Sequence, residues 1–281
     1  TTKATKEIAG RYGGLENLGD QLMKSENFEM AIGEIVWLIA LLANQSILIH
    51  NEHTIPRCFS MLIDFHTHAF PDTIGPGAVE KLAVVSGGLE PHTDGTVGGL
   101  RQAMARDGVD LSVVLNIATN ARQQGKVNDF AAAINNEQDI FSFGSVFPGS
   151  EDAFEELERI KEMGLKGVKF HPEYQQFAVD DPRWHPLYRK ISDLGLITVF
   201  HSGMDYGFPP PYGCMPEGLA SVLDCFETPV VAAHWGGLQY GEDVLRHLCG
   251  REVYLDPSFG YGRLSKYHAE QIIEKHGVDK L

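Results

Sequence analysis

The sequence predicts an α/β fold whose parallel strands form a (β/α)8 barrel, and three observations support this class. From residue 61 onward, short apolar runs alternate with amphipathic segments, with one of each about every 30 residues, the size of one βαβ unit. The runs are almost continuously apolar, as parallel strands covered on both faces should be. Most runs end in a histidine or an aspartate, and barrel enzymes build their sites at the carboxyl ends of their strands.

The predicted strands follow one another at regular intervals along the chain. In order, they cover residues 62–66, 109–118, 140–147, 165–170, 196–200, 229–233 and 252–255. Alternation of this kind fits either a doubly wound sheet or a closed barrel. The polar residues at the strand ends favour the barrel, because a barrel brings all the carboxyl ends to one rim.

Amphipathic helices are predicted between these strands. Ser150 opens one of them, and Gly164 closes it, since hydroxyl residues favour helix starts and glycine favours helix ends. Its apolar positions include Leu157 and Ile160, which share one helix face. Further helices are expected over residues 184–193, 216–225, 242–248 and 265–276.

Residues 1–60 do not share this pattern and are predicted to form a separate helical segment before the barrel of residues 61–281. Residues 28–50 read as a single helix that is apolar around most of its circumference, so it must pack on something. The segment, with Arg11-Tyr12-Gly13-Gly14, resembles small helical tail-assembly proteins of phages. The alternatives are an N-terminal extension that caps the bottom of the barrel and a fused reading frame.

Composition and charge restrict the classes of partner. The 281 residues are 43% hydrophobic and 22% charged, which is ordinary for a globular protein. The net charge of −15 argues against nucleic acid or an anionic membrane as the main partner, because both require a basic surface. The most apolar run, residues 35–43, is shorter than the roughly 20 residues that span a bilayer. No cysteines form a C-x-x-C pair and no signal peptide is evident, so a cytoplasmic location is expected.

Histidines follow the first, fourth, fifth and sixth predicted strands. They are His66 and His68, His171, His201 and His234, and Asp256 follows the seventh strand. His66 and His68 are two residues apart, so they point to the same side of a strand. Neutral imidazoles bind zinc well, and iron, manganese or nickel with less preference. A divalent ion at this rim would acidify a bound water or polarise a substrate carbonyl or carboxylate.

These residues carry a resemblance to a known family. The segments Ile63-Asp64-Phe65-His66-Thr67-His68, Gly167-Val168-Lys169-Phe170-His171-Pro172, Val199-Phe200-His201 and Ala233-His234-Trp235-Gly236-Gly237 resemble the amidohydrolase-related (amidohydrolase 2) family. This is the branch of metal-dependent hydrolases and decarboxylases that includes aminocarboxymuconate semialdehyde decarboxylase. The resemblance extends from residue 61 to the end of the chain, and it implies a TIM barrel of the metal-dependent hydrolase type.

The resemblance also implies roles for individual residues. His66, His68 and His201 are the expected metal ligands, with zinc as the expected metal, and His234 is the expected catalytic acid or base. His171 is expected to be a further ligand or a substrate contact, and Tyr174 lies on the same loop as a substrate-binding candidate. The aromatic and proline-rich residues 204–212 suggest a substrate wall.

The sequence departs from the family pattern at its eighth strand. That strand normally carries an aspartate that binds the metal and activates water, and residues 277–281 read as the approach to it. Asp279 lies before the expected position and does not match it. As written, the barrel therefore lacks the eighth strand, and we expect impaired activity.

Two functional hypotheses follow. The first is a metal-dependent hydrolase or a non-oxidative decarboxylase (a lyase) of a small, carboxylated molecule, with Arg122, Arg183 and Arg263 as candidate carboxylate contacts. The alternative is a catalytically impaired or non-enzymatic barrel that serves as a binding module. The expected partner is a small-molecule substrate, and a homodimer is compatible with the resemblance.

Overall fold

The computed structural model describes residues 61–260 and 262–281, which belong to the compact unit Met61–Leu281. The helix predicted over residues 28–50 lies outside these residues. The assignment of residues 1–60 to a helical segment therefore stays a prediction.

The strands form two parallel sheets that share their direction and chain order. The first sheet runs β1-β2-β3 and the second runs β4-β5-β6-β7. A backbone bridge between Gly144 and Val168 joins β3 to β4. Every predicted strand is present, although most are shorter than expected: β1 (Ile63–Thr67), β2 (Leu111–Leu115), β3 (Ile140–Phe143), β4 (Gly167–Phe170), β5 (Ile197–Phe200), β6 (Val230–Ala232) and β7 (Tyr254–Leu255).

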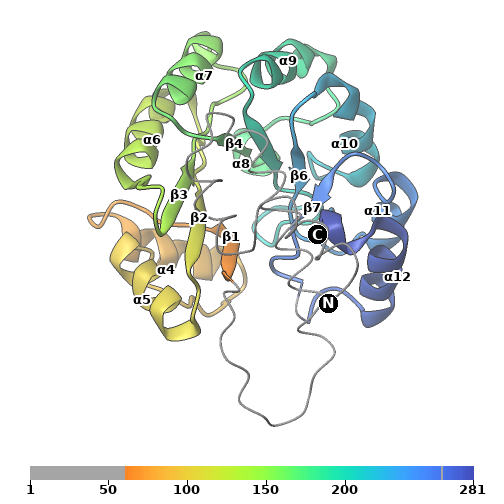
Figure 1. The fold of residues 1–281 in the computed structure, drawn as a ribbon, viewed down its shortest axis with the longest axis horizontal. Coiled ribbons are helices and arrows are strands. Elements are labelled where there is room, and N and C mark those ends of the chain that lie inside the picture. Colours follow the sequence, from red (N-terminus) through yellow and green to blue (C-terminus); the bar gives the residue numbers. More distant parts are fainter. Residues whose placement is uncertain (1–60, 261) are drawn as a thin grey trace, which may run out of the picture. The chain divides into compact units, whose positions relative to one another are not determined.

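Helices lie around the outside of these strands (Figure 1). Those of the second half were predicted to within a few residues, whereas α4, α5 and α6 were not identified individually. The helices are α4 (Gly75–Val85), α5 (Val97–Asp107), α6 (Ala121–Ile134), α7 (Ala153–Glu162), α8 (Pro172–Gln175), α9 (His185–Asp193), α10 (Pro216–Val222), α11 (Gly241–His247) and α12 (Lys266–His276), with 3-10 turns at Pro182–Trp184, Leu223–Cys225 and Val278–Lys280.

Alternation along each strand separates two apolar cores. Val199 and Val231 belong to a cluster that fills the space between the strands, together with side chains of the other strands. Their neighbours Phe200 and Ala232 face the other way, into the larger cluster under the surrounding helices. This two-layer packing is the arrangement of a TIM-type barrel, so the predicted fold class is confirmed.

The described residues contain seven strands. Within this part of the chain, β1 pairs with β2 alone and β7 pairs with β6 alone. Asp279, which the sequence placed before an eighth strand, lies exposed in the turn Val278–Lys280. No helix among the described residues is long and apolar enough to cross a membrane.

Candidate metal centre

Strand alternation explains why the polar residues of the second sheet point into the barrel. Val168 and Phe170 face the helices, so Lys169 and then His171 point inward. His201 follows Phe200 in the same way, and Asp256 follows Leu255. Lys169, His171, His201 and Asp256 are all buried.

The histidines of β1 point into the same region of the barrel because the strand contains an irregularity. The register between β1 and β2 shifts between Asp64 and Thr67, which is the signature of a bulge. Bulges re-aim side chains and are common beside active sites. The His66 and His68 rings lie 5.2 Å apart, centroid to centroid, so the structure places these two predicted ligands together.

His234 lies in a turn of unusual backbone conformation. His234, Trp235 and Gly236 have φ values of 60°, 61° and 83°, so three consecutive residues occupy the left-handed region. For residues other than glycine this conformation costs of order 1–3 kcal/mol, and it clusters at functional sites. The turn after β6 folds the His234 ring back toward the other histidines.

The five predicted histidines form one continuous line of rings. His66 stacks on His234 at 5.0 Å, and His234 contacts His201 at 4.8 Å. His201 stacks on His171 at 4.0 Å with 13° between the ring planes. His68 extends the line beyond His66. The side chains named from the sequence therefore converge, although they come from four different strands.

Hydrogen bonds fix the orientation of the two histidines of the first strand. His66 Nδ1 is paired with the Asp256 carboxylate, and Ser258 Oγ lies 3.0 Å from both His66 Nδ1 and Asp256 Oδ2. His68 Nδ1 donates to the carbonyl of Leu115 at 2.8 Å. Each ring thereby keeps Nε2 available as a lone-pair donor to a metal, which is the usual role of a carboxylate or carbonyl partner behind a metal-binding histidine.

Burial keeps these imidazoles uncharged. Burial and the nearby Lys169 together lower the pKa of His66 to about 4, against the opposing effect of Asp256. Burial and the neighbouring His66 lower the pKa of His234 to about 3, and burial also lowers the pKa of His201 well below its ordinary value. Burial alone would raise the pKa of Asp256, but its interaction with the adjacent His66 lowers it below its usual range. Neutral imidazoles beside an ionised carboxylate are a donor set that suits a divalent ion.

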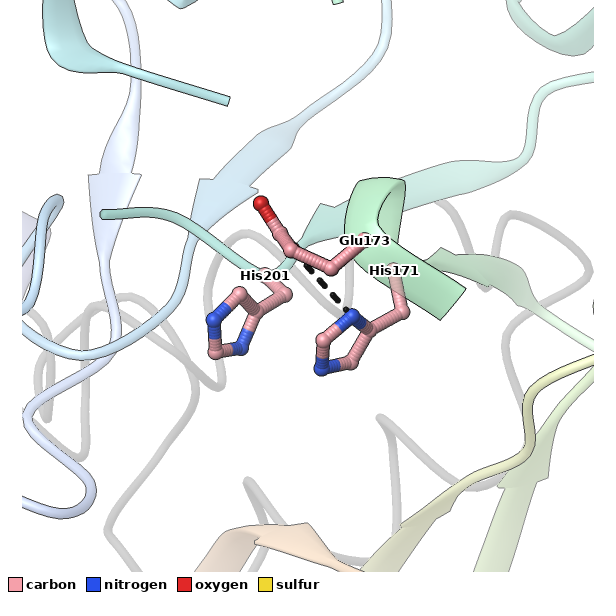
Figure 2. A group of neighbouring side chains, drawn as sticks. All are labelled: His171, Glu173 and His201. Carbon is pink, nitrogen blue, oxygen red and sulfur yellow. Dashed lines mark ion pairs between the residues drawn. The ribbon is translucent and has the colours of Figure 1, made fainter. Parts of the chain in front are cut away.

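His201 also belongs to a second group of potential metal ligands. Figure 2 shows His171 and His201 with their rings side by side and Glu173 beside them, and one ligand atom from each of the three lies within 4.8 Å of the others. His171 Nδ1 lies 3.3 Å from Glu173 Oε2, and His171 Nε2 lies 3.3 Å from Asp205 Oδ2.

Lys169 lies at the centre of this set of charges. Its side chain is 1% exposed, and its Nζ has no hydrogen-bond partner among the described residues. Burial lowers the pKa of Lys169 to about 8, while the carboxylates of Asp256 and Glu173 oppose this shift. A buried polar atom without a hydrogen-bond partner is rare and indicates that the site accommodates a further charged or polar group. A metal ion with its bound substrate would be such a group.

Aromatic side chains border the histidines. The Tyr174 ring contacts His171 at 4.6 Å and Phe208 at 4.9 Å. The Phe259 ring lies 5.9 Å from His234, and the Arg263 guanidinium lies 4.1 Å from the centre of Phe259. Of the other two candidate arginines, Arg183 is exposed and bonded to Asp181, and Arg122 is exposed.

Several residues of the centre were not assigned a role from the sequence. Asp256 was noted only as a strand end, and Ser258, Glu173 and Asp205 were not singled out. Each of these residues lies within a few residues of the end of a strand, so its position in the sequence is compatible with a side chain at the rim of the barrel. Nothing in the sequence shows that Asp256 meets His66, which is 190 positions away.

Comparison with known proteins gives a family and a set of similar folds. The profile of the family described as Amidohydrolase matches residues 63–279, which is most of the chain. A search of curated proteins gives no significant match.

Solved structures of similar fold include an uncharacterized TIM-barrel protein from Bordetella bronchiseptica, with a TM-score of 0.59, 20% identity and coverage of 75% of this chain and 79% of that one. Another is 5-carboxyvanillate decarboxylase from Sphingomonas paucimobilis, with a TM-score of 0.51, 20% identity and coverage of 77% and 85%. A third is a dihydroxybenzoic acid decarboxylase from a Polaromonas species with bound manganese and the inhibitor 2-nitroresorcinol, with a TM-score of 0.54, 13% identity and coverage of 79% and 85%.

Proposed function

The chain belongs to the Amidohydrolase family of divalent-metal-dependent enzymes, and on that premise we propose that it is a decarboxylase of a small carboxylated aromatic molecule. The observation that carries the proposal is the line of uncharged histidines from His68 to His201, with His234 in its middle. The metal, the substrate and the residue roles are parts of this proposal.

His66, His68 and His201 would hold the metal. The Nε2 atoms of the first two rings are left available by their Nδ1 partners, Asp256 and the carbonyl of Leu115. A divalent ion bound there would supply a positive charge that binds the carboxylate of the substrate. Manganese is a candidate beside zinc, because a protein of the same fold has been solved with manganese bound.

His234 would move the proton. Its Nε2 lies 3.1 Å from His201 Nδ1, and its Nδ1 lies 3.1 Å from Ser258 Oγ, so hydrogen bonds hold the ring in place. A substrate carboxylate next to His234 would favour the protonated imidazole, because an opposite charge nearby raises a histidine pKa. His234 could then deliver the proton to the carbon that loses its carboxyl group.

The substrate class is supported by the walls of the site and by the named neighbours. Tyr174 and Phe208 offer ring faces and edges beside His171, at one end of the histidine line. Phe259 lies beside His234 in the middle of the line, and Arg263 provides a positive charge over Phe259. Two of the proteins of similar fold are named as decarboxylases of 5-carboxyvanillate and of dihydroxybenzoic acid, and both of these compounds are aromatic acids. Both observations favour an aromatic carboxylate as the substrate of this chain.

Hydrolysis of a small amide, ester or lactone is the second candidate. The ionised carboxylate of Asp256 favours it, because a carboxylate near a metal can take the proton of an attacking water. Decarboxylation needs a proton donor instead, so the two reactions make different demands on the same site.

The test loads the purified chain with Mn²⁺ or Zn²⁺ and offers two panels of substrates. One panel contains hydroxylated aromatic acids, with CO₂ release as the signal, and the other contains amides, esters and lactones, with acid release as the signal. We expect turnover on the first panel only. Turnover confined to the second panel would identify the hydrolase. A metal-loaded protein that is inactive on both would support the binding-module alternative.

A further inference from the structure

The hydroxyl of Ser258 connects a predicted metal ligand with the predicted acid or base. Ser258 Oγ lies 3.0 Å from both His66 Nδ1 and Asp256 Oδ2. The same oxygen lies 3.1 Å from His234 Nδ1. We propose that Ser258 is a positioning residue that decides which nitrogen of the His234 ring carries a proton. This inference rests on the proposed function, in which His234 is the acid or base, and it identifies the nitrogen with which that ring works.

The carbonyl of Ser258 fixes the proton of His234. Ser258 O lies 3.3 Å from His234 Nδ1. A carbonyl oxygen only accepts, so this hydrogen bond requires a proton on Nδ1. A neutral His234 then keeps a lone pair on Nε2, and Nε2 is the nitrogen that can take up and release a proton during the reaction.

The hydroxyl supports the same arrangement. It has one proton to donate, and two of its three neighbours have no lone pair for it. His66 Nδ1 donates to the Asp256 carboxylate, and His234 Nδ1 carries the proton that Ser258 O requires. Ser258 Oγ therefore donates to Asp256 Oδ2 and accepts from His234 Nδ1. Its bond to the carboxylate makes the hydroxyl a better acceptor, because hydrogen bonds in a chain polarise one another.

His201 makes the opposite demand on the His234 ring. Its Nε2 lies 3.3 Å from the carbonyl of Met204, which requires a proton on Nε2 and leaves Nδ1 as an acceptor. His201 Nδ1 lies 3.1 Å from His234 Nε2, so it would then need a proton from that nitrogen. Two neutral rings cannot satisfy both carbonyls at the same time. Met204 O and Ser258 O therefore compete for the tautomer of His234.

Metal binding would decide this competition in favour of Ser258. As a metal ligand, His201 Nε2 carries no proton, so the proton of the neutral ring lies on Nδ1. The hydrogen bonds then run in one direction, from His201 Nδ1 to His234 Nε2 and from His234 Nδ1 to Ser258 Oγ. The chain ends at Asp256, which also accepts from His66, the ligand on the other side. One carboxylate thus supports both a predicted ligand and the predicted acid or base.

The competing explanation is that Ser258 only stabilises the segment after β7. Its backbone N–H donates to Asp256 Oδ1 at 2.8 Å, and this hydrogen bond does not involve the hydroxyl. Ser258→Ala keeps the backbone bond and removes the hydroxyl alone, so the variant should fold. Ser258→Thr keeps both. The two explanations differ in the tautomer that they require of His234.

The experiment determines the tautomer of His234 by ¹⁵N NMR of histidine-labelled protein, and the His234→Asn spectrum identifies the signals. In the Zn²⁺-loaded wild type, we expect the proton of His234 on Nδ1. In metal-free protein, Ser258→Ala should increase the fraction of rings protonated on Nε2, whereas Ser258→Thr should leave it unchanged. With an accepted substrate, Ser258→Ala should lower kcat by about 10–100-fold at unchanged KM and metal content, and Ser258→Thr should recover most of this loss.

Ser221→Ala is the matched control, because Ser221 is exposed on α10 and its hydroxyl donates to Gly218 O of the same helix. A proton on His234 Nε2 in the Zn²⁺-loaded wild type would overturn the proposal. Equal tautomer fractions in metal-free Ser258→Ala and wild type would also overturn it, whatever the effect on kcat. A wild type that is inactive on every substrate panel would contradict the proposed function alone, because the position of the proton is measured without a substrate.

Discussion

At the scale of single residues, the centre depends on partners that hold histidine rings in one tautomer. His66 is uncharged and paired with the ionised Asp256, and Ser258 bonds to both. The pair combines a neutral base with a negative charge in a buried place, which is the condition that metal ligands need. Loss of the carboxylate should therefore affect the metal more than the fold.

The first prediction concerns Asp256→Asn. An amide is uncharged and can present its N–H₂ group to His66 Nδ1, so the tautomer that frees Nε2 loses its support. We expect metal affinity to fall by about 10–100-fold, measured by competition with a chelating dye. Asp279→Asn is the control, because Asp279 is exposed in a turn. Equal affinity of both variants would show that Asp256 does not support His66 in this way.

The second prediction concerns His234→Asn. Asparagine can keep a hydrogen bond to Ser258, but it cannot carry a proton to the substrate. If His234 is the acid or base, kcat on an accepted substrate should fall by about 10²–10⁴-fold while the metal content stays unchanged. The comparison is with His92→Asn, whose histidine is exposed. A variant that loses its metal together with its activity would identify His234 as a ligand instead.

At the scale of elements, the loops after β5 and β6 are joined by backbone contacts that place His201 and His234 side by side. Leu238 N–H donates to Ser202 O at 3.0 Å, and Met204 N–H donates to Leu238 O at 3.0 Å. Gly203 lies between them with a φ of 83°, and a Cβ there would be 2.3 Å from Leu238 N. The joint needs glycine for both its conformation and its close approach.

The third prediction follows from this joint. Gly203→Ala should destabilise the protein by about 2–4 kcal/mol, because it adds a steric clash to the conformational strain. Gly108→Ala is the matched control: Gly108 has a φ of 72°, but nothing lies within 4 Å of its added Cβ, so only the strain of about 1–2 kcal/mol remains. Urea unfolding measures both values. Equal losses would show that the loop yields to the methyl group.

At the scale of the whole molecule, buried neutral histidines tie stability to pH. His276 is a clear case, at the end of α12 and outside the candidate metal centre. Its Nδ1 accepts from Gly250 N–H at 3.1 Å and its Nε2 donates to Val253 O at 2.9 Å, so α12 is bonded to the loop before β7. Burial lowers the pKa of His276 below its ordinary 6.5, as it does for His66, His201 and His234.

The fourth prediction is a loss of stability in acid. A histidine whose pKa is lowered by folding binds fewer protons in the folded state than in the unfolded state. Its stabilisation is therefore complete above pH 6.5 and is lost as the pH falls toward the folded pKa values, about 4 for His66. Below pH 6.5, each such histidine lowers the free energy of unfolding by up to about 1.4 kcal/mol per pH unit.

The measurement is urea unfolding of metal-free protein at pH 7.5 and at pH 5. His276→Gln should show a smaller difference between the two pH values than the wild type, because one titrating group is removed. An exposed histidine changed in the same way, His92→Gln, should leave the difference unaltered. A wild type whose stability rises at pH 5 would contradict the prediction.

The sequence by itself determined the order of strands, the class of fold and the residues at the rim. It could do so because parallel strands buried on both faces leave continuous apolar runs, and because their carboxyl ends share one edge. The histidines at those ends therefore had to converge in any barrel built from these segments. The helices α4, α5 and α6, which precede the third strand, were not identified individually from the sequence.

Only the tertiary structure decided which rim residues meet. Asp256 pairs with His66 because the carboxyl ends of β7 and β1, the outer strands of the two sheets, come together. His171 stacks on His201 because β4 and β5 are neighbours with matched register. His234 joins them through a left-handed turn whose backbone angles the sequence does not reveal. Contacts of this kind depend on the direction of a side chain at one point in space, and strand order alone does not fix that direction.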